Sequence, residues 1–154
     1  MQASALGHFM RESGPWTYAI VNLAHVLGIA TLFGSILILD LRLIGLWRRV
    51  PLQALSSAIV PVATAGFAIA ATTGIGLLAT KTTEYVGNPF LLIKFPAIAL
   101  GLINAAMIRR TEAWTAHRRR DLTPEEQRVL TILGALSLVC WLTAVTAGRM
   151  IAYW

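Results

Sequence analysis

One histidine, His25, lies inside a long apolar segment and is the residue whose type and position best suit chemistry. It follows Trp16 by nine positions, which is roughly 14 Å along a helix at about 1.5 Å per residue. At that depth in a bilayer, a neutral imidazole needs a hydrogen-bond partner or a metal. The alternatives are an interhelix hydrogen bond to a threonine, an asparagine or a carbonyl, ligation of a haem iron or another metal, and quinone or proton handling.

A six-coordinate haem needs a second axial ligand beside His25, and His8 is the first candidate. His8 precedes the apolar segment and reaches the same region if residues 2–12 form an interfacial helix. Met10 and Met150 are alternative ligands. The ligand spacing of a zinc or copper site is absent from the sequence, so the cofactor hypothesis is b-type haem on His25 and His8.

Further polar side chains fall within or beside the apolar segments, where burial of a polar group is costly and often functional. Lys94 can extend outward to the membrane surface, or it can face other helices together with Ala97 and Gly101. The polar candidates in or at the edges of the segments, besides His25, are Asn22, Asp40, Arg42, Lys94 and Asn104.

Asp40 and Arg42 flank the end of the first apolar segment. Residues two apart point to different sides of a helix, so these two side chains do not pair well with each other. Arg109 or Arg110, expected at the same membrane face, is the predicted partner of Asp40.

The elements that must position these residues are four apolar blocks. The chain of 154 residues is 56% hydrophobic and only 13% charged, and blocks of about 20 apolar residues match the thickness of a bilayer. The sequence predicts an all-α, integral membrane four-helix bundle that forms a single domain over residues 1–154. The predicted spans are 16–39, 55–80, 89–108 and 124–148.

Local signals support these limits. Asn88-Pro89 and Thr123-Pro124-Glu125-Glu126 read as helix N-termini, the second with a capping box. The apolar pattern of the first block continues to Trp47, which predicts a helix protruding from the membrane. Pro61 and Pro96 are expected near helix starts, where proline costs least.

Positive charges predict the orientation of the chain. Nine arginines lie on one side of the predicted spans and four basic residues on the other, and the richer side faces the cytoplasm. Both termini are therefore expected on the outer, periplasmic side of a bacterial inner membrane. The N-terminal stretch lacks the pattern of a cleavable signal peptide, so the first span is expected to act as its own insertion signal.

Small residues recur at helical spacing and predict packing faces. Gly66, Ala70 and Gly74 form such a stripe in the second block, and Ala97 and Gly101 form one in the third. In the fourth block the expected inward residues are Ser137, Cys140, Ala144 and Ala147. Close backbone approach between small residues drives helix association in lipid.

Several motifs together resemble a family of small bacterial inner-membrane proteins known as an uncharacterised domain with four predicted spans. In the first helix they are His25-Val-Leu-Gly28, Phe33-Gly34-Ser35 and Asp40-Leu-Arg42-Leu-Ile-Gly45. In the third they are Asn88-Pro89-Phe90 with Lys94, and Gly101-Leu-Ile-Asn104-Ala105. The resemblance supports the architecture and adds weight to His25, Asp40, Arg42, Asn88, Pro89 and Lys94. It implies no activity.

Three classes of function remain open. The leading hypothesis is a non-enzymatic membrane subunit that anchors or stabilises a larger complex of respiratory or redox type. The first alternative is an electron-transfer subunit with b-type haem on His25, and the second is a small transporter or ion-handling protein. No nucleotide loop, catalytic triad or carboxylate pair is present in the sequence. The basic residues cluster beside apolar blocks, so we expect lipids and other membrane subunits or a second copy as partners, bound lipid, and no nucleic acid.

Overall fold

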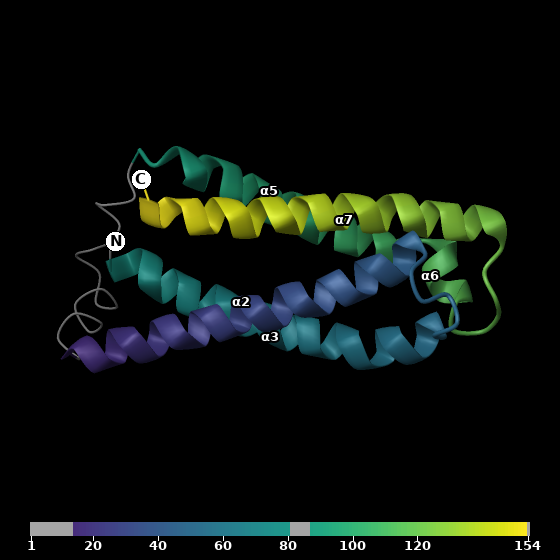
Figure 1. Cartoon of the computed structure of the whole chain (residues 1–154), viewed down its shortest axis with the longest axis horizontal. Coiled ribbons are helices and arrows are strands. Elements are labelled where there is room, and N and C mark those ends of the chain that lie inside the picture. Colours follow the sequence, from purple (N-terminus) through teal and green to yellow (C-terminus); the bar gives the residue numbers. More distant parts are fainter. Residues whose placement is uncertain (1–13, 81–86, 154) are drawn as a thin grey trace.

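The computed structural model describes residues 14–80 and 87–153, and over these residues the protein is helical without strands (Figure 1). Four of its helices are long and apolar enough to cross a membrane. The elements are α2 (Gly14–Ile44), α3 (Leu52–Thr80), α5 (Pro89–Arg110), the short α6 (Glu112–Ala116), α7 (Pro124–Met150) and the 3-10 turn η1 (Ile151–Tyr153).

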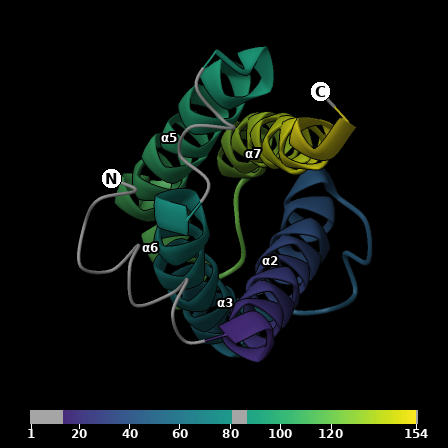
Figure 2. The same ribbon diagram turned by 90° about the vertical axis from the view of Figure 1, so that its left-hand side faces the viewer.

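The long helices form two antiparallel pairs, α2 with α3 and α5 with α7. Contact between α2 and α7 joins the pairs, whereas α3 and α5 do not pack along their lengths. The end-on view shows α7 above α2 and the two pairs as separate layers (Figure 2). Figure 1 shows that α2 begins and α7 ends at the same end of the bundle.

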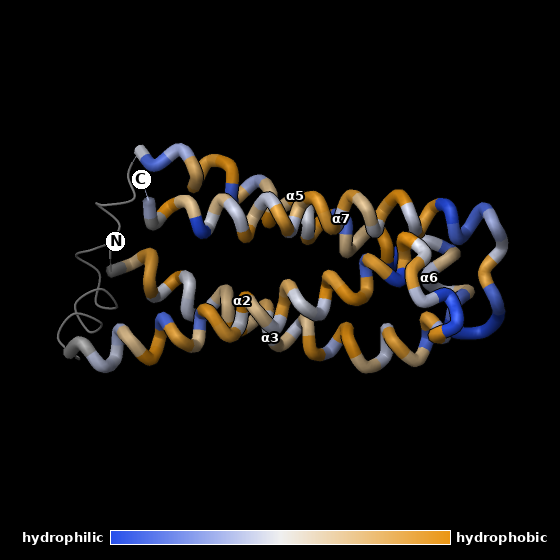
Figure 3. The backbone as a smooth tube through the Cα atoms, in the orientation of Figure 1, coloured by the Kyte–Doolittle hydropathy of each residue, from blue (hydrophilic) through white to orange (hydrophobic). Residues whose placement is uncertain are grey.

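The opposite end holds the turn after α2, the helix α6 and the segment before α7, and hydrophilic residues gather there (Figure 3). We call it the arginine-rich end, because it carries Arg48, Arg49, Arg109, Arg110, Arg118, Arg119 and Arg120. Helix α2 ends at Ile44, so the expected continuation to Trp47 is wrong. The reason is local: Gly45 and Trp47 have φ angles of +123° and +50°, which no right-handed helix accommodates.

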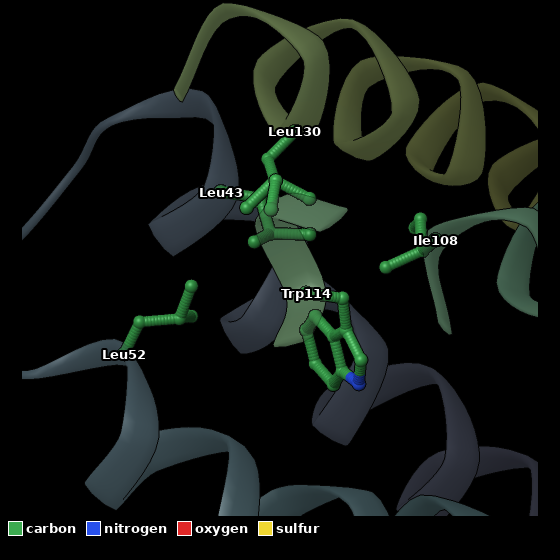
Figure 4. Packing of buried hydrophobic residues seen from close by; sticks show 6 residues of the cluster. Leu43, Leu52, Ile108, Trp114 and Leu130 are labelled. Atoms are coloured by element: carbon green, nitrogen blue, oxygen red, sulfur yellow. The ribbon is translucent and has the colours of Figure 1, made fainter. Parts of the chain in front are cut away.

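A small apolar cluster closes the bundle near this end (Figure 4). Its members come from every helix of the described chain, which explains why it holds the two pairs together. They are Leu43, Leu52, Ile108, Ala113, Trp114 and Leu130. Two side chains of α7 complete the contact: Gln127 Nε2 and Thr131 Oγ1 donate to the carbonyl of Leu43, at 2.8 and 3.0 Å. These bonds satisfy a carbonyl that the helix end leaves free.

The predicted small-residue stripes lie at helix contacts, which confirms them. Gly66 and Ala70 are buried against α2, where a Cβ built at Gly66 would lie 2.7 Å from the backbone nitrogen of Leu32. Gly101 is covered by the indole of Trp141, 3.0 Å from a built Cβ. The expected inward residues of α7, Ser137, Cys140, Ala144 and Ala147, are all buried.

The predicted N-terminal caps are confirmed. Asn88 Oδ1 accepts from the backbone nitrogen of Phe90 at 2.9 Å, and Thr123 with Glu126 forms the expected capping box. The prolines differ from the prediction: Pro61 and Pro96 lie inside α3 and α5. Helix α3 starts at Leu52, earlier than the predicted residue 55, directly after Pro51, whose carbonyl accepts from the backbone nitrogen of Leu55.

Candidate functional site

His25 lies at the contact between α2 and α3. Its Nδ1 is 3.0 Å from Thr73 Oγ1, and Thr73 Oγ1 donates to the carbonyl of Ile69 at 2.5 Å. With the Thr73 hydroxyl proton directed to the Ile69 carbonyl, the His25 tautomer that is protonated on Nδ1 donates to Thr73. An interhelix hydrogen bond to a threonine, one of the expected partners, is confirmed, and in this tautomer Nε2 keeps its lone pair. The ring packs on Gly74, where a built Cβ would lie 2.9 Å from Cε1.

Lys94 faces the bundle rather than extending straight outward. It shares a helix face with the buried residues Ala97, Gly101 and Asn104, and its side chain lies over Gly148 of α7. A Cβ built at Gly148 would lie 3.4 Å from Lys94 Nζ. The charge of Lys94 also acts electrostatically on the His25 ring.

Asp40 is buried at the contact between α2 and α7. Its carboxyl group lies close enough to the hydroxyl of Ser137 to interact with it, and its Oδ2 atom is buried without a hydrogen-bond partner. The predicted ion pair with Arg109 or Arg110 is wrong, since both arginines are exposed on α5 and Asp40 points toward α7. Helix rotation, which sequence spacing leaves undetermined between distant segments, decides this difference.

Asn104 is buried on α5 and reaches the backbone of α7. Its Nδ2 donates to the carbonyl of Leu133 at 2.9 Å, while Oδ1 is buried without a partner. Asn22, another polar candidate, is exposed on α2. The two asparagines therefore differ: Asn104 serves a helix contact, and Asn22 points away from the bundle.

Arg42 holds the turn that follows α2. Its Nε donates to the carbonyl of Val50 at 2.8 Å, and Nη2 lies 3.5 Å from the carbonyl of Arg48. The side chain is buried, and Nη1 has no partner. Through these bonds Arg42 stabilises the turn at the arginine-rich end and does not pair with Asp40.

His117 is a buried polar residue to which the sequence analysis assigned no role. The residue follows α6, is buried, and its Nε2 lies 3.0 Å from Ser56 Oγ of α3. Burial lowers the pKa of His117 below its usual 6.5, the Trp114 carbonyl acts in the opposite direction, and Arg118 lowers it further. The overlooked signal was Thr111, which caps a short helix carrying the buried Trp114.

The proposed second haem ligand, His8, and its alternative Met10 lie outside the described residues. Within residues 14–80 and 87–153, no group of three or more histidine, cysteine or acidic side chains is arranged to hold a metal ion. The candidate site therefore consists of two parts: His25 with Thr73 and Lys94 toward one end of the bundle, and Asp40 with Ser137 and Asn104 toward the arginine-rich end.

Four spanning helices with polar groups buried between them define a multi-pass α-helical membrane protein. Comparison with protein families identifies it more closely: residues 1–154 match the "Family of unknown function (DUF6644)", and the chain belongs to that family. No curated protein and no solved structure matches the chain. The expected resemblance to an uncharacterised family is thereby confirmed.

Proposed function

We propose that this protein is a non-enzymatic integral membrane subunit that anchors or stabilises a larger complex, of respiratory or redox type, in a bacterial inner membrane. The observation that carries the proposal is the composition of the exposed surface of α3. Small side chains are the majority on this surface, which also exposes Val62, Ile69 and Ile75, and we call the small ones the outer face of α3. They are Ala54, Ser57, Ala58, Thr64, Ala65, Ala68 and Thr72.

Helix α5 provides the contrast. Its exposed side chains are mostly large, as at Leu92, Phe95 and Leu100, which are 78%, 52% and 57% exposed. Lipid tails cover such a surface well. Small residues instead let another helix approach closely, and close packing is the main driving force for helix association in lipid. Helix α3 also has the smallest buried share of the four spans, so this face is available to a partner helix.

The test compares matched substitutions on the two helices. Ala58→Leu with Ala65→Leu adds volume to the outer face of α3, one heptad apart, and Ala99→Leu adds the same group to the exposed side of α5. The complex isolated from native membranes should have a smaller mass than the wild-type complex when it carries the α3 variant. With the α5 variant its mass should equal that of the wild-type complex. Co-expression of two differently tagged copies separates self-association from a foreign partner. A wild-type particle with the mass of one chain would contradict the proposal.

A b-type haem electron-transfer subunit is the second candidate, and the hydrogen bond of His25 favours it. Histidines that ligate a metal through one nitrogen commonly hold the other N–H in a hydrogen bond, which fixes the tautomer. Thr73 plays that part here, and the lone pair of Nε2 stays free for iron. His25 thus fits one axial ligand, and haem would supply one-electron transfer.

The haem candidate is tested by the absorption spectrum of the purified, dithionite-reduced protein. A sharp b-type band that disappears in His25→Gln and persists in Asn22→Gln would support it. The same band would persist with a small shift in Thr73→Val, because that change removes only the acceptor for Nδ1–H. A spectrum without absorbance in the visible range would eliminate this candidate.

A further inference from the structure

Three buried polar side chains from three different helices meet at α7, in the half of the bundle nearer the arginine-rich end. Asp40 of α2, Ser137 of α7 and Asn104 of α5 are 2%, 4% and 1% exposed. The Asp40 carboxyl group lies close enough to the Ser137 hydroxyl to interact with it, and Asn104 Nδ2 donates to the Leu133 carbonyl at 2.9 Å. We call these three side chains and that carbonyl the oxygen cluster.

The backbone of α7 shows that the two contacts are close together. In a helix the carbonyl of residue 133 accepts from the nitrogen of residue 137, so the partners of Asn104 and Asp40 are neighbours. Two successive hydrogen bonds place the Asn104 amide within about 6 Å of the Ser137 backbone nitrogen. Gly134 lets α2 approach α7 closely at this point, because a Cβ built there would lie 3.3 Å from the Asp40 carbonyl oxygen.

Two acceptors of the oxygen cluster are unsatisfied. Asp40 Oδ2 and Asn104 Oδ1 are both buried without a hydrogen-bond partner. Because Asn104 Nδ2 already donates to Leu133, the amide cannot turn to offer a donor without losing that bond. A buried carboxylate with no countercharge is expensive, and an unpaired buried carbonyl adds to the cost. Both oxygens require a positively charged or proton-bearing occupant.

The charged side chains around the oxygen cluster do not supply it. Helix α3 contains no titratable residue, and Arg42 of α2 is bonded to the turn after that helix. On the other two helices the charges lie near the ends. On α5 they are Lys94, Arg109 and Arg110, and on α7 they are Glu125, Glu126, Arg128 and Arg149. Among the described residues, none forms an ion pair with Asp40.

We propose that the oxygen cluster binds one monovalent cation, a proton or Na⁺. A carboxylate, a hydroxyl and an amide oxygen are hard oxygen donors of the kind that alkali and alkaline-earth cations take. The single carboxylate supplies one negative charge, which one monovalent cation neutralises. This cation site is independent of the anchoring role, because the oxygen cluster lies on the contact of α7 with α2 and α5, away from the outer face of α3.

The two occupants exclude one another in a balanced exchange. The Asp40 carboxylic acid and Na⁺ give the Asp40 carboxylate with bound Na⁺ and one released proton. With the proton in place, Asp40 donates a hydrogen bond to an acceptor of the cluster. With Na⁺ in place, the oxygens of Asp40, Ser137 and Asn104 are ligands.

The experiment measures this exchange on the full-length protein in weakly buffered detergent. Addition of NaCl, with choline chloride at equal ionic strength as reference, should release about one proton per chain if Na⁺ replaces the proton. Asp40→Asn should abolish the release. Ser137→Ala should raise the Na⁺ concentration needed, while Ser35→Ala, which removes another buried hydroxyl from the helix of Asp40, should leave it unchanged.

Infrared spectroscopy of the wild-type protein identifies the occupant without relying on a variant that has to fold. A protonated carboxyl band that Na⁺ removes indicates exchange between the two cations. A band that Na⁺ leaves in place, that base removes, and that is missing in Asp40→Asn indicates a proton as sole occupant. An ionised Asp40 at every pH combined with no response to Na⁺ would overturn the proposal.

Discussion

In the α2–α3 pair glycines let two backbones touch, whereas in the α5–α7 pair an indole ring fills the space beside a glycine. A Cβ at Gly28 would lie 2.8 Å from the backbone nitrogen of Ala70, but a Cβ at Gly101 would meet the side chain of Trp141. A backbone cannot move without displacing its helix, while a ring can shift within its contact. Small-residue stripes that look alike in the sequence can therefore form helix contacts that differ in how well they accept an added methyl group.

The largest effect is expected at Gly66. Gly66→Ala places a methyl group 2.7 Å from the backbone nitrogen of Leu32, so the helices must separate. We expect a loss of about 3 kcal/mol in the free energy of unfolding, measured by SDS titration in mixed micelles. Gly34→Ala is the matched control on α2, since a built Cβ there meets nothing within 4 Å. Equal stability of the two variants would contradict the backbone contact.

A smaller loss is expected at Gly101. Gly101→Ala brings a methyl group to 3.0 Å from Trp141 Cε2, and we expect a cost of about 1 kcal/mol, because the ring can move. Trp141→Phe makes room for the methyl group, so the double variant should lose less than the sum of the single changes. Strict additivity in this double-mutant cycle, measured by the same titration, would show that ring and methyl group do not meet.

The smallest effect concerns the bond between α3 and the end of α6. Ser56 Oγ donates to the carbonyl of Gln53 and is hydrogen bonded to His117 Nε2, and the loss of this hydroxyl in Ser56→Ala should cost about 0.5 kcal/mol near neutral pH. Because burial lowers the pKa of His117, the neutral histidine contributes fully to the free energy of unfolding above pH 6.5. This stability is lost as the pH falls below that value, where the buried ring must take up a proton. His117→Gln should flatten this acid-side decline. If the free energy of unfolding fell equally with pH in His117→Gln and in the wild type, His117 would not be the group that causes the decline.

The sequence was sufficient for features that depend on local pattern. Spans, caps at Asn88 and Thr123, and the inward stripe through Gly66 follow from hydropathy, side-chain chemistry and helical periodicity. A threonine was one of three hydrogen-bond partners expected for His25, because a buried imidazole must be satisfied. Which threonine it is depends on how α2 and α3 are rotated and shifted relative to one another, and a single sequence does not determine that.

The partner of Asp40 could not be identified from the sequence. Its charge suggested an arginine partner, yet the structure turns it toward Ser137. Charge complementarity ranks possible partners, but helix rotation selects among them. The burial of His117 was missed for a related reason, since abundant arginines mark a segment as exposed on average and conceal the short helix inside it.

The separation of the long helices into two pairs has a consequence for biogenesis. The contact between α2 and α3 involves neighbouring spans, whereas the contact between α2 and α7 needs the last span. Contacts between segments close in sequence form with a smaller loss of chain entropy. We therefore expect the α2–α3 hairpin to form in the bilayer during synthesis, before the α5–α7 hairpin is inserted and packs against it. Cysteine pairs introduced across each contact, sampled on ribosome-stalled chains of increasing length, should crosslink in that order.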